Sequence, residues 1–156
     1  MAIDNISHPP LRHIATFLSS GTFTVPDGVG RVYATVEGAR GTSNRGQNAG
    51  STNRTSGYVQ VIPGKSAQVI IGASAGENAS AGTTSFDGAI QVFGSASSNH
   101  NGRYNQNSAG GNAAASSLTT SLPTGAPDGA IVRVSGSTTA SYTPASGATG
   151  VVHIYG

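Results

Sequence analysis

The stretch Gly21–Gly41, GTFTVPDGVGRVYATVEGARG, contains the clearest fold signal of the chain. Phe23 and Val25 alternate with threonines, and the later part, RVYATVE, again places an apolar side chain at every second position. A period of two is that of a half-buried β-strand. Between the two strands, Pro26–Gly28 supplies a proline that presets φ, an aspartate that bonds the following backbone and a glycine that accepts a positive φ. The stretch therefore predicts two strands joined by a tight turn, a β-hairpin.

Similar patterns recur along the chain. The alternating segment Gly57–Ile62 is followed by a Pro-Gly turn and by Ala67–Gly72, which predicts a second hairpin. Further predicted strands are Leu11–Leu18, Ala89–Phe93 and Ala130–Val134, the last two after Asp-Gly turns, and the closing segment Val151–Tyr155. Helix-forming residues are scarce, whereas Val, Ile, Thr, Tyr and Gly are prominent. The sequence therefore predicts an all-β fold, a β-sandwich or jelly-roll-like domain.

The predicted organisation is one domain preceded by a short arm. Residues 1–10 end in His-Pro-Pro, which favours extended polyproline geometry, and we expect an N-terminal arm there. Residues 11–156 form the β-domain, interrupted by polar excursions at 41–56, 73–82 and 94–117 that are rich in Ser, Asn, Gly and Ala. Such long polar segments cannot build a core of their own, so we expect them to be loops.

Composition excludes several classes of protein. The chain has no cysteine, so disulfides and thiolate chemistry are excluded. No apolar run is long enough to predict a membrane span, and the first residues lack the pattern of a secretory signal. The net charge is only +2, and the basic residues Arg40, Arg45 and Arg54 fall in one polar loop without interleaved aromatic residues. Nucleic-acid binding needs a denser basic face, so we expect no nucleic-acid partner and no membrane insertion.

Several short motifs, in order, resemble a known family. The opening motif FTVPxGV from Phe23 is followed by Val36-x-Gly38-Ala39-x-Gly41, and later by Gly57-Tyr58-Val59 and Val61-x-Pro63-Gly64. Val69-x-Ile71-Gly72, Gly82-Thr83-Thr84-Ser85-Phe86 and the closing Val151–Tyr155 complete the series. This order resembles the glycine-rich domain of bacteriophage tail-fibre and minor tail proteins, over roughly residues 17–94 plus the closing strand. The chain departs from the family pattern in its loops, which are Ser/Asn/Ala/Gly mixtures rather than glycine runs.

The resemblance implies a non-enzymatic structural component of a bacteriophage virion, in the tail, a fibre or the capsid decoration. It implies other virion proteins as partners, a location on the outside of the particle and a homo-oligomer, of which a trimer is favoured. These implications are expectations that follow from the resemblance. The arm residues Ile3, Ile6, Pro9 and Pro10 are candidates for the attachment to a neighbouring protein.

The alternative function is a receptor- or glycan-binding module. His100, Arg103 and Tyr104 lie in a segment rich in Asn and Gln, and tyrosine with such polar neighbours forms adaptable contact surfaces. These three residues are a candidate contact loop for a host surface glycan, although a plain exposed loop explains the same composition. On this hypothesis Tyr104→Ala weakens glycan binding and leaves the fold intact.

The third hypothesis is a small hydrolase. Gly72–Gly76 reads Gly-Ala-Ser-Ala-Gly, the pattern of a nucleophile elbow around Ser74, but an elbow also needs a helix directly after the serine. The residues after Gly76 do not predict one, and the pattern arises easily by chance in a chain this rich in Gly and Ser. The carboxylates and histidines show no pairing or ligand spacing, so we expect no catalytic residues, no metal and no cofactor.

Overall fold

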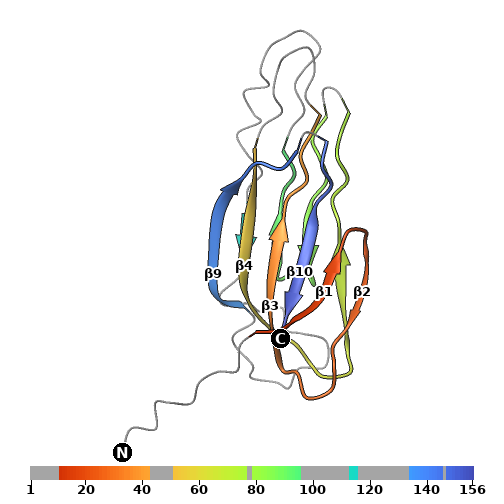
Figure 1. Ribbon diagram of the computed structural model, residues 1–156, viewed down its shortest axis with the longest axis vertical. Coiled ribbons are helices and arrows are strands. Elements are labelled where there is room, and N and C mark those ends of the chain that lie inside the picture. The colour runs from red at the N-terminus through yellow and green to blue at the C-terminus, as the bar shows by residue number, and fades with distance from the viewer. Residues whose placement is uncertain (1–10, 43–50, 77–78, 96–112, 116–133, 146) are drawn as a thin grey trace, which may run out of the picture.

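The computed structural model describes residues 11–42, 51–76, 79–95, 113–115, 134–145 and 147–156 (Figure 1). Within these residues the secondary structure is entirely β, in ten strands. In chain order the strands are β1 (His13–Phe17), β2 (Gly21–Thr24), β3 (Arg31–Glu37), β4 (Thr52–Gln60), β5 (Ser66–Ile70), β6 (Thr84–Phe86), β7 (Ile90–Val92), β8 (Ala113–Ala115), β9 (Val134–Tyr142) and β10 (Val151–Tyr155). The predicted all-β fold is confirmed.

The strands form two antiparallel five-stranded sheets. Sheet A has the order β1-β10-β3-β4-β9, and Figure 1 shows these strands side by side. Sheet B has the order β2-β5-β6-β7-β8. One buried cluster contains side chains of both sheets, among them Val32 and Ile154 from sheet A and Phe23, Phe86 and Ile90 from sheet B. The two sheets therefore pack face to face around one core, as in a β-sandwich.

Burial follows the alternation read from the sequence. In β3 the side chains of Val32, Ala34 and Val36 are buried, whereas those of Arg31 and Tyr33 face outward. The same alternation governs β10, where Val152 and Ile154 are fully buried. The core stabilises the fold because each such side chain removes apolar surface from water, about 1.5–3 kcal/mol for a Val- or Ile-sized group.

The two predicted hairpins are wrong, although their turns are present. β2 lies in sheet B and β3 in sheet A, and β4 and β5 are divided in the same way. Thr24, the last residue of β2, pairs with Ser66 of β5, not with a residue of β3. The turns at Pro26–Gly28 and Pro63–Gly64 are instead corners at which the chain passes from one sheet to the other. The two corners lie side by side, because the Val25 carbonyl accepts a hydrogen bond from Gly64 N at 2.9 Å. Turn residues make the chain reverse, but burial of both apolar faces decides which strand pairs with which.

Two predicted polar excursions are shorter in the structure. Residues 52–56 belong to β4, where Thr52 and Thr55 are fully buried, and residues 113–115 form β8. The reason is that β-branched threonines suit a strand, and the pairing of β4 with both β3 and β9 satisfies their backbone groups. The predicted arm 1–10, most of the excursion 94–117 and the Asp-Gly turn before Ala130 lie outside the described residues.

The corner glycine Gly28 gives a first testable prediction. Its φ is +80°, and nothing lies within 4 Å of a Cβ placed there, so an alanine would meet backbone strain without a clash. Left-handed backbone costs an L-residue about 1–2 kcal/mol, partly offset by a stiffer unfolded chain. Gly28→Ala is therefore expected to lower the free energy of unfolding by about 1 kcal/mol, measured by urea denaturation.

Gly30 is the matched control for this substitution. It lies two residues along the same corner, and a Cβ there also meets nothing within 4 Å, but its φ is outside the left-handed region. Gly30→Ala should leave stability within about 0.5 kcal/mol of the wild type or raise it slightly. Equal losses in the two variants would contradict the assignment of the cost to the backbone angle of Gly28.

Candidate functional site

The outer face of sheet A contains the densest group of aromatic and charged side chains in the described residues. These side chains occupy the strand positions that alternate with the buried valines and isoleucine, so the period of two places them on the side away from the core. Antiparallel pairing then brings residues from distant parts of the chain next to one another: Tyr33 lies opposite both Tyr155 and Tyr58. We describe this face as the candidate functional site.

Four rings form a line across four neighbouring strands, and we call this line the aromatic row: His13 of β1, Tyr155 of β10, Tyr33 of β3 and Tyr58 of β4. Successive ring centroids are 5.5, 6.4 and 5.0 Å apart, and the rings are inclined to one another by 55–70°. Inclined contacts of this kind are a favoured geometry of aromatic pairs. The guanidinium of Arg31 lies 4.5 Å from the centroid of the Tyr58 ring and extends the row by a cation–π contact.

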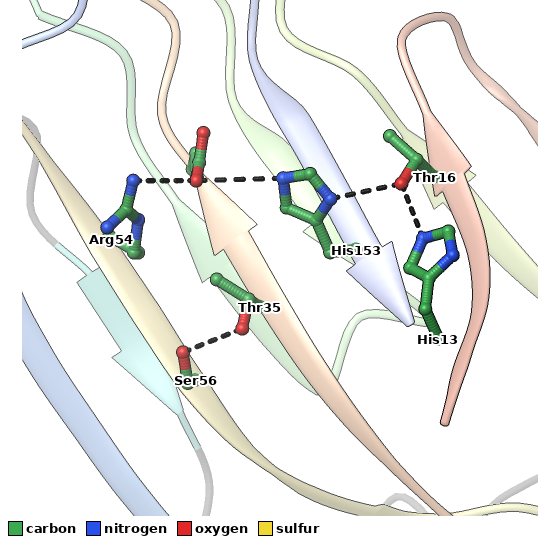
Figure 2. A network of polar contacts seen from close by, with 7 residues as sticks. His13, Thr16, Thr35, Arg54, Ser56 and His153 are labelled. Carbon is green, nitrogen blue, oxygen red and sulfur yellow. Dashed lines mark hydrogen bonds and ion pairs between the residues drawn. The ribbon is translucent and has the colours of Figure 1, made fainter. Parts of the chain in front are cut away.

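A line of polar contacts crosses the same four strands, as Figure 2 shows. The Thr16 hydroxyl lies between His13 Nε2, at 2.7 Å, and His153 Nδ1, at 3.0 Å. His153 Nε2 is 3.7 Å from Glu37 Oε1, and Arg54 Nη2 is 2.8 Å from the same oxygen. These contacts join neighbouring strands of sheet A on their outer side.

Glu37 is the only carboxylate in this line, and it is shielded from solvent. Its side chain is 10% exposed, while that of its partner Arg54 is 44% exposed. Arg54 also lies over the ring of Tyr142 on β9, 4.3 Å from its centroid, which carries the contacts to the fifth strand. The negative charge is thus covered and paired, and the guanidinium of Arg54 that pairs with it remains partly exposed to solvent.

The Glu37–Arg54 pair gives a second prediction. Because one partner is half exposed, the interaction is screened by water, and a double-mutant cycle with Glu37→Gln and Arg54→Gln is expected to give a coupling energy of about 0.5–1 kcal/mol. Urea unfolding of the four proteins measures it. Repeating the cycle in about 1 M NaCl should reduce the coupling, since salt screens the exposed partner. A coupling near zero at low salt would show that the pair contributes nothing to stability.

The residues predicted from the sequence as contacts lie outside the described residues. These are the contact loop, His100, Arg103 and Tyr104, and the arm residues Ile3, Ile6, Pro9 and Pro10. Of the arginines assigned to one polar loop, Arg54 is instead in β4, and Arg40 donates a hydrogen bond to the Pro144 carbonyl at 2.7 Å. The third arginine, Arg45, lies outside the described residues.

The segment around Ser74 follows β5 as a loop in the part the structure describes. Ser74 is half-buried, and the carbonyl of the next residue, Ala75, accepts a hydrogen bond from Thr42 N at 3.2 Å. Gly82 N donates to the Ala73 carbonyl at 2.8 Å, so this loop is tied back to the start of the β6 region. The described residues therefore place Ser74 in a loop fixed by backbone hydrogen bonds, without the helix of an elbow up to Gly76.

The described part of the chain contains little that points to another kind of site. No three or more His, Cys, Asp or Glu side chains there come together as a metal site requires. No helix in that part could cross a membrane. A small pocket between the two corners is lined by Val25, Val61, Lys65 and Asp87, and it has room for about one water molecule. The outer face of sheet A thus remains the surface with the most recognition chemistry.

The aromatic row was missed by sequence reasoning, although a signal for it exists. Tyr33, Tyr58 and Tyr155 each stand next to a buried residue of a strand, at the phase where soluble proteins place small polar or charged side chains. Three tyrosines at outward-facing positions of three strands indicate a binding surface. Their meeting in one line depends on strand order and register, which no local pattern specifies.

No protein-family model matches the chain, and no curated protein or solved structure is significantly similar to it. The resemblance to phage tail proteins therefore depends on the short motifs alone, and function has to be argued from the geometry.

Proposed function

We propose that this chain is a non-enzymatic structural protein of a bacteriophage particle, a rigid β-sandwich that acts by protein–protein assembly. Two features of the chain support the proposal. The ordered motifs from Phe23 to Phe86 and in the closing strand resemble the glycine-rich domain of phage tail proteins. Two of the motif glycines also stand where an added Cβ would overlap neighbouring atoms of the sandwich, which is the observation that carries the proposal.

Gly38 and Gly72 are the motif glycines at these positions. A Cβ on Gly38 would overlap the side chain of Thr52 and approach Val92 Cγ1 to 2.8 Å. A Cβ on Gly72 would overlap the backbone carbonyl of Gly82, which is itself a motif glycine. The shared motif therefore describes a packing requirement of this fold and not merely a glycine-rich composition. A resemblance made of such positions supports a common architecture, and with it the assembly role.

In this proposal the domain attaches to another virion protein through the arm 1–10 or an exposed strand face, and copies of the chain associate as a trimer on the outside of the particle. The particle role is tested by mass spectrometry of purified virions with immunogold electron microscopy. The expected result is a protein present in many copies at the tail, a fibre or the capsid surface. Absence of the chain from purified particles would refute the proposal.

The trimer is tested separately by light scattering coupled to gel filtration. The expected mass is three times the 15.4 kDa of one chain. A single species at the mass of one chain, at every concentration tried, would refute the self-assembled trimer. The protein would then be expected to bind to the capsid lattice as single copies, as a decoration protein does.

A further inference from the structure

The aromatic row has the form of a line and not of a compact patch. One ring comes from each of four adjacent strands, and the register places Tyr155 opposite His13 and Tyr33 opposite both Tyr155 and Tyr58. The line therefore runs across the strands. Energetic contacts of protein–protein interfaces cluster at the centre of a patch, whereas a line of rings matches a linear ligand built of repeated units.

The row also offers hydrogen-bonding groups along its length. Within the described residues, the hydroxyls of Tyr33, Tyr58 and Tyr155 have no hydrogen bond to the protein, and the rings are half-buried, so their positions are held by the sheet. Beside the rings, the hydroxyls of Thr35 and Ser56 bond each other at 2.9 Å (Figure 2). Apolar ring area next to fixed hydroxyl groups suits a sugar, which has C–H faces and hydroxyl edges.

The charged side chains on this face favour one class of sugar polymer over others. The Glu37 carboxylate is covered and paired with Arg54, so it repels an approaching anion weakly. Arg31 is exposed at the end of the aromatic row, and it has no acidic partner among the described residues. A guanidinium with free donors recognises carboxylate and sulfate groups through paired hydrogen bonds. The face is therefore complementary to a negatively charged chain.

We propose that the outer face of sheet A is a binding site for an acidic polysaccharide, which lies along the aromatic row across β4, β3, β10 and β1. The sugar units pack on the rings of Tyr33 and Tyr155, and an acidic group of the chain pairs with Arg31, whose guanidinium lies over the Tyr58 ring. This site differs from the predicted contact loop, and it does not depend on the particle role proposed above: the protein can bind such a polymer whether or not it is part of a virion.

The test is native affinity electrophoresis of the full chain in gels containing hyaluronan, alginate or, as the neutral polymer, dextran. The acidic polymers should retard the wild-type protein at about 50 mM NaCl, less at about 500 mM, where charge is screened, and dextran should retard it least. Tyr33→Ala is expected to weaken binding about ten-fold through loss of the ring. Arg31→Gln is expected to weaken it about three- to ten-fold through loss of the charge.

Gln68→Ala is the control, because Gln68 is an exposed residue of β5 in sheet B. This variant should bind the acidic polymers as the wild-type protein does. Arg31→Gln changes only the exposed end of a side chain, so this variant is expected to fold. If Tyr33→Ala does not fold, binding by Arg31→Gln alone tests the proposal. The proposal is overturned if neither acidic polymer retards the protein, if dextran retards it equally, or if both variants on the face bind normally. It is also overturned if sedimentation shows a dimer that Tyr33→Ala abolishes, since the face would then belong to a second copy.

Discussion

Phe86→Ala is expected to lower the free energy of unfolding by about 3–5 kcal/mol, the largest effect of any single truncation in this core. Phe86 is fully buried on β6, the middle strand of sheet B, and its ring centroid is 6.2 Å from that of Phe23 on β2. Truncation leaves a cavity that neighbouring strands, fixed by their ladders, cannot fill. Because whole domains are stable by only about 5–15 kcal/mol, the variant should be close to unfolding.

Guanidinium unfolding followed by circular dichroism measures this loss as a shift of the midpoint with little change of slope. The matched control is Leu18→Ala, because the Leu18 side chain is 68% exposed beyond the end of β1 and should change stability by no more than about 0.5 kcal/mol. A loss below about 1 kcal/mol for Phe86→Ala would mean that the core can collapse around the missing ring.

Gly72→Ala is expected to cost about 2–4 kcal/mol, through overpacking and the weakening of buried hydrogen bonds. An added Cβ would overlap the carbonyl of Gly82 and lie 3.1 Å from the carbonyl carbon of Thr83, and backbone cannot rotate away as a side chain can. Three hydrogen bonds hold this crossing together: Gly72 N donates to Thr84 Oγ1 at 3.0 Å, Gly82 N to the Ala73 carbonyl at 2.8 Å and Gly150 N to the Gly72 carbonyl at 2.9 Å.

Gly76→Ala is the control for this substitution, four residues along the same loop. Nothing lies within 4 Å of a Cβ at Gly76, so its stability should stay within about 0.5 kcal/mol of the wild type. Thermal unfolding of both variants distinguishes a packing requirement from a general need for flexibility in the loop. If Gly76→Ala lost as much stability as Gly72→Ala, the close approach of the two chain segments would not be the cause.

The candidate site was open to prediction only in part. That Tyr33 faces away from Val32 and Ala34 follows from the two-residue period of the strand. That Tyr33 meets Tyr155, at the other end of the chain, follows from β10 entering sheet A between β1 and β3. The same insertion brings His153 between Thr16 and Glu37, so the polar line too is a product of strand order.

What the sequence determined by itself is local: the all-β class, most strand positions, the buried alternation of β3 and β10, and the turns at Gly28, Gly64 and Gly88, whose φ angles are all positive. These follow from side-chain period and backbone sterics, which act over a few residues. Only the tertiary structure decided the partners. The turn between β2 and β3 has the residues typical of a β-hairpin, yet the two strands lie in opposite sheets. The physical reason is that enclosing one core between two sheets buries more apolar surface than pairing β2 with β3 would.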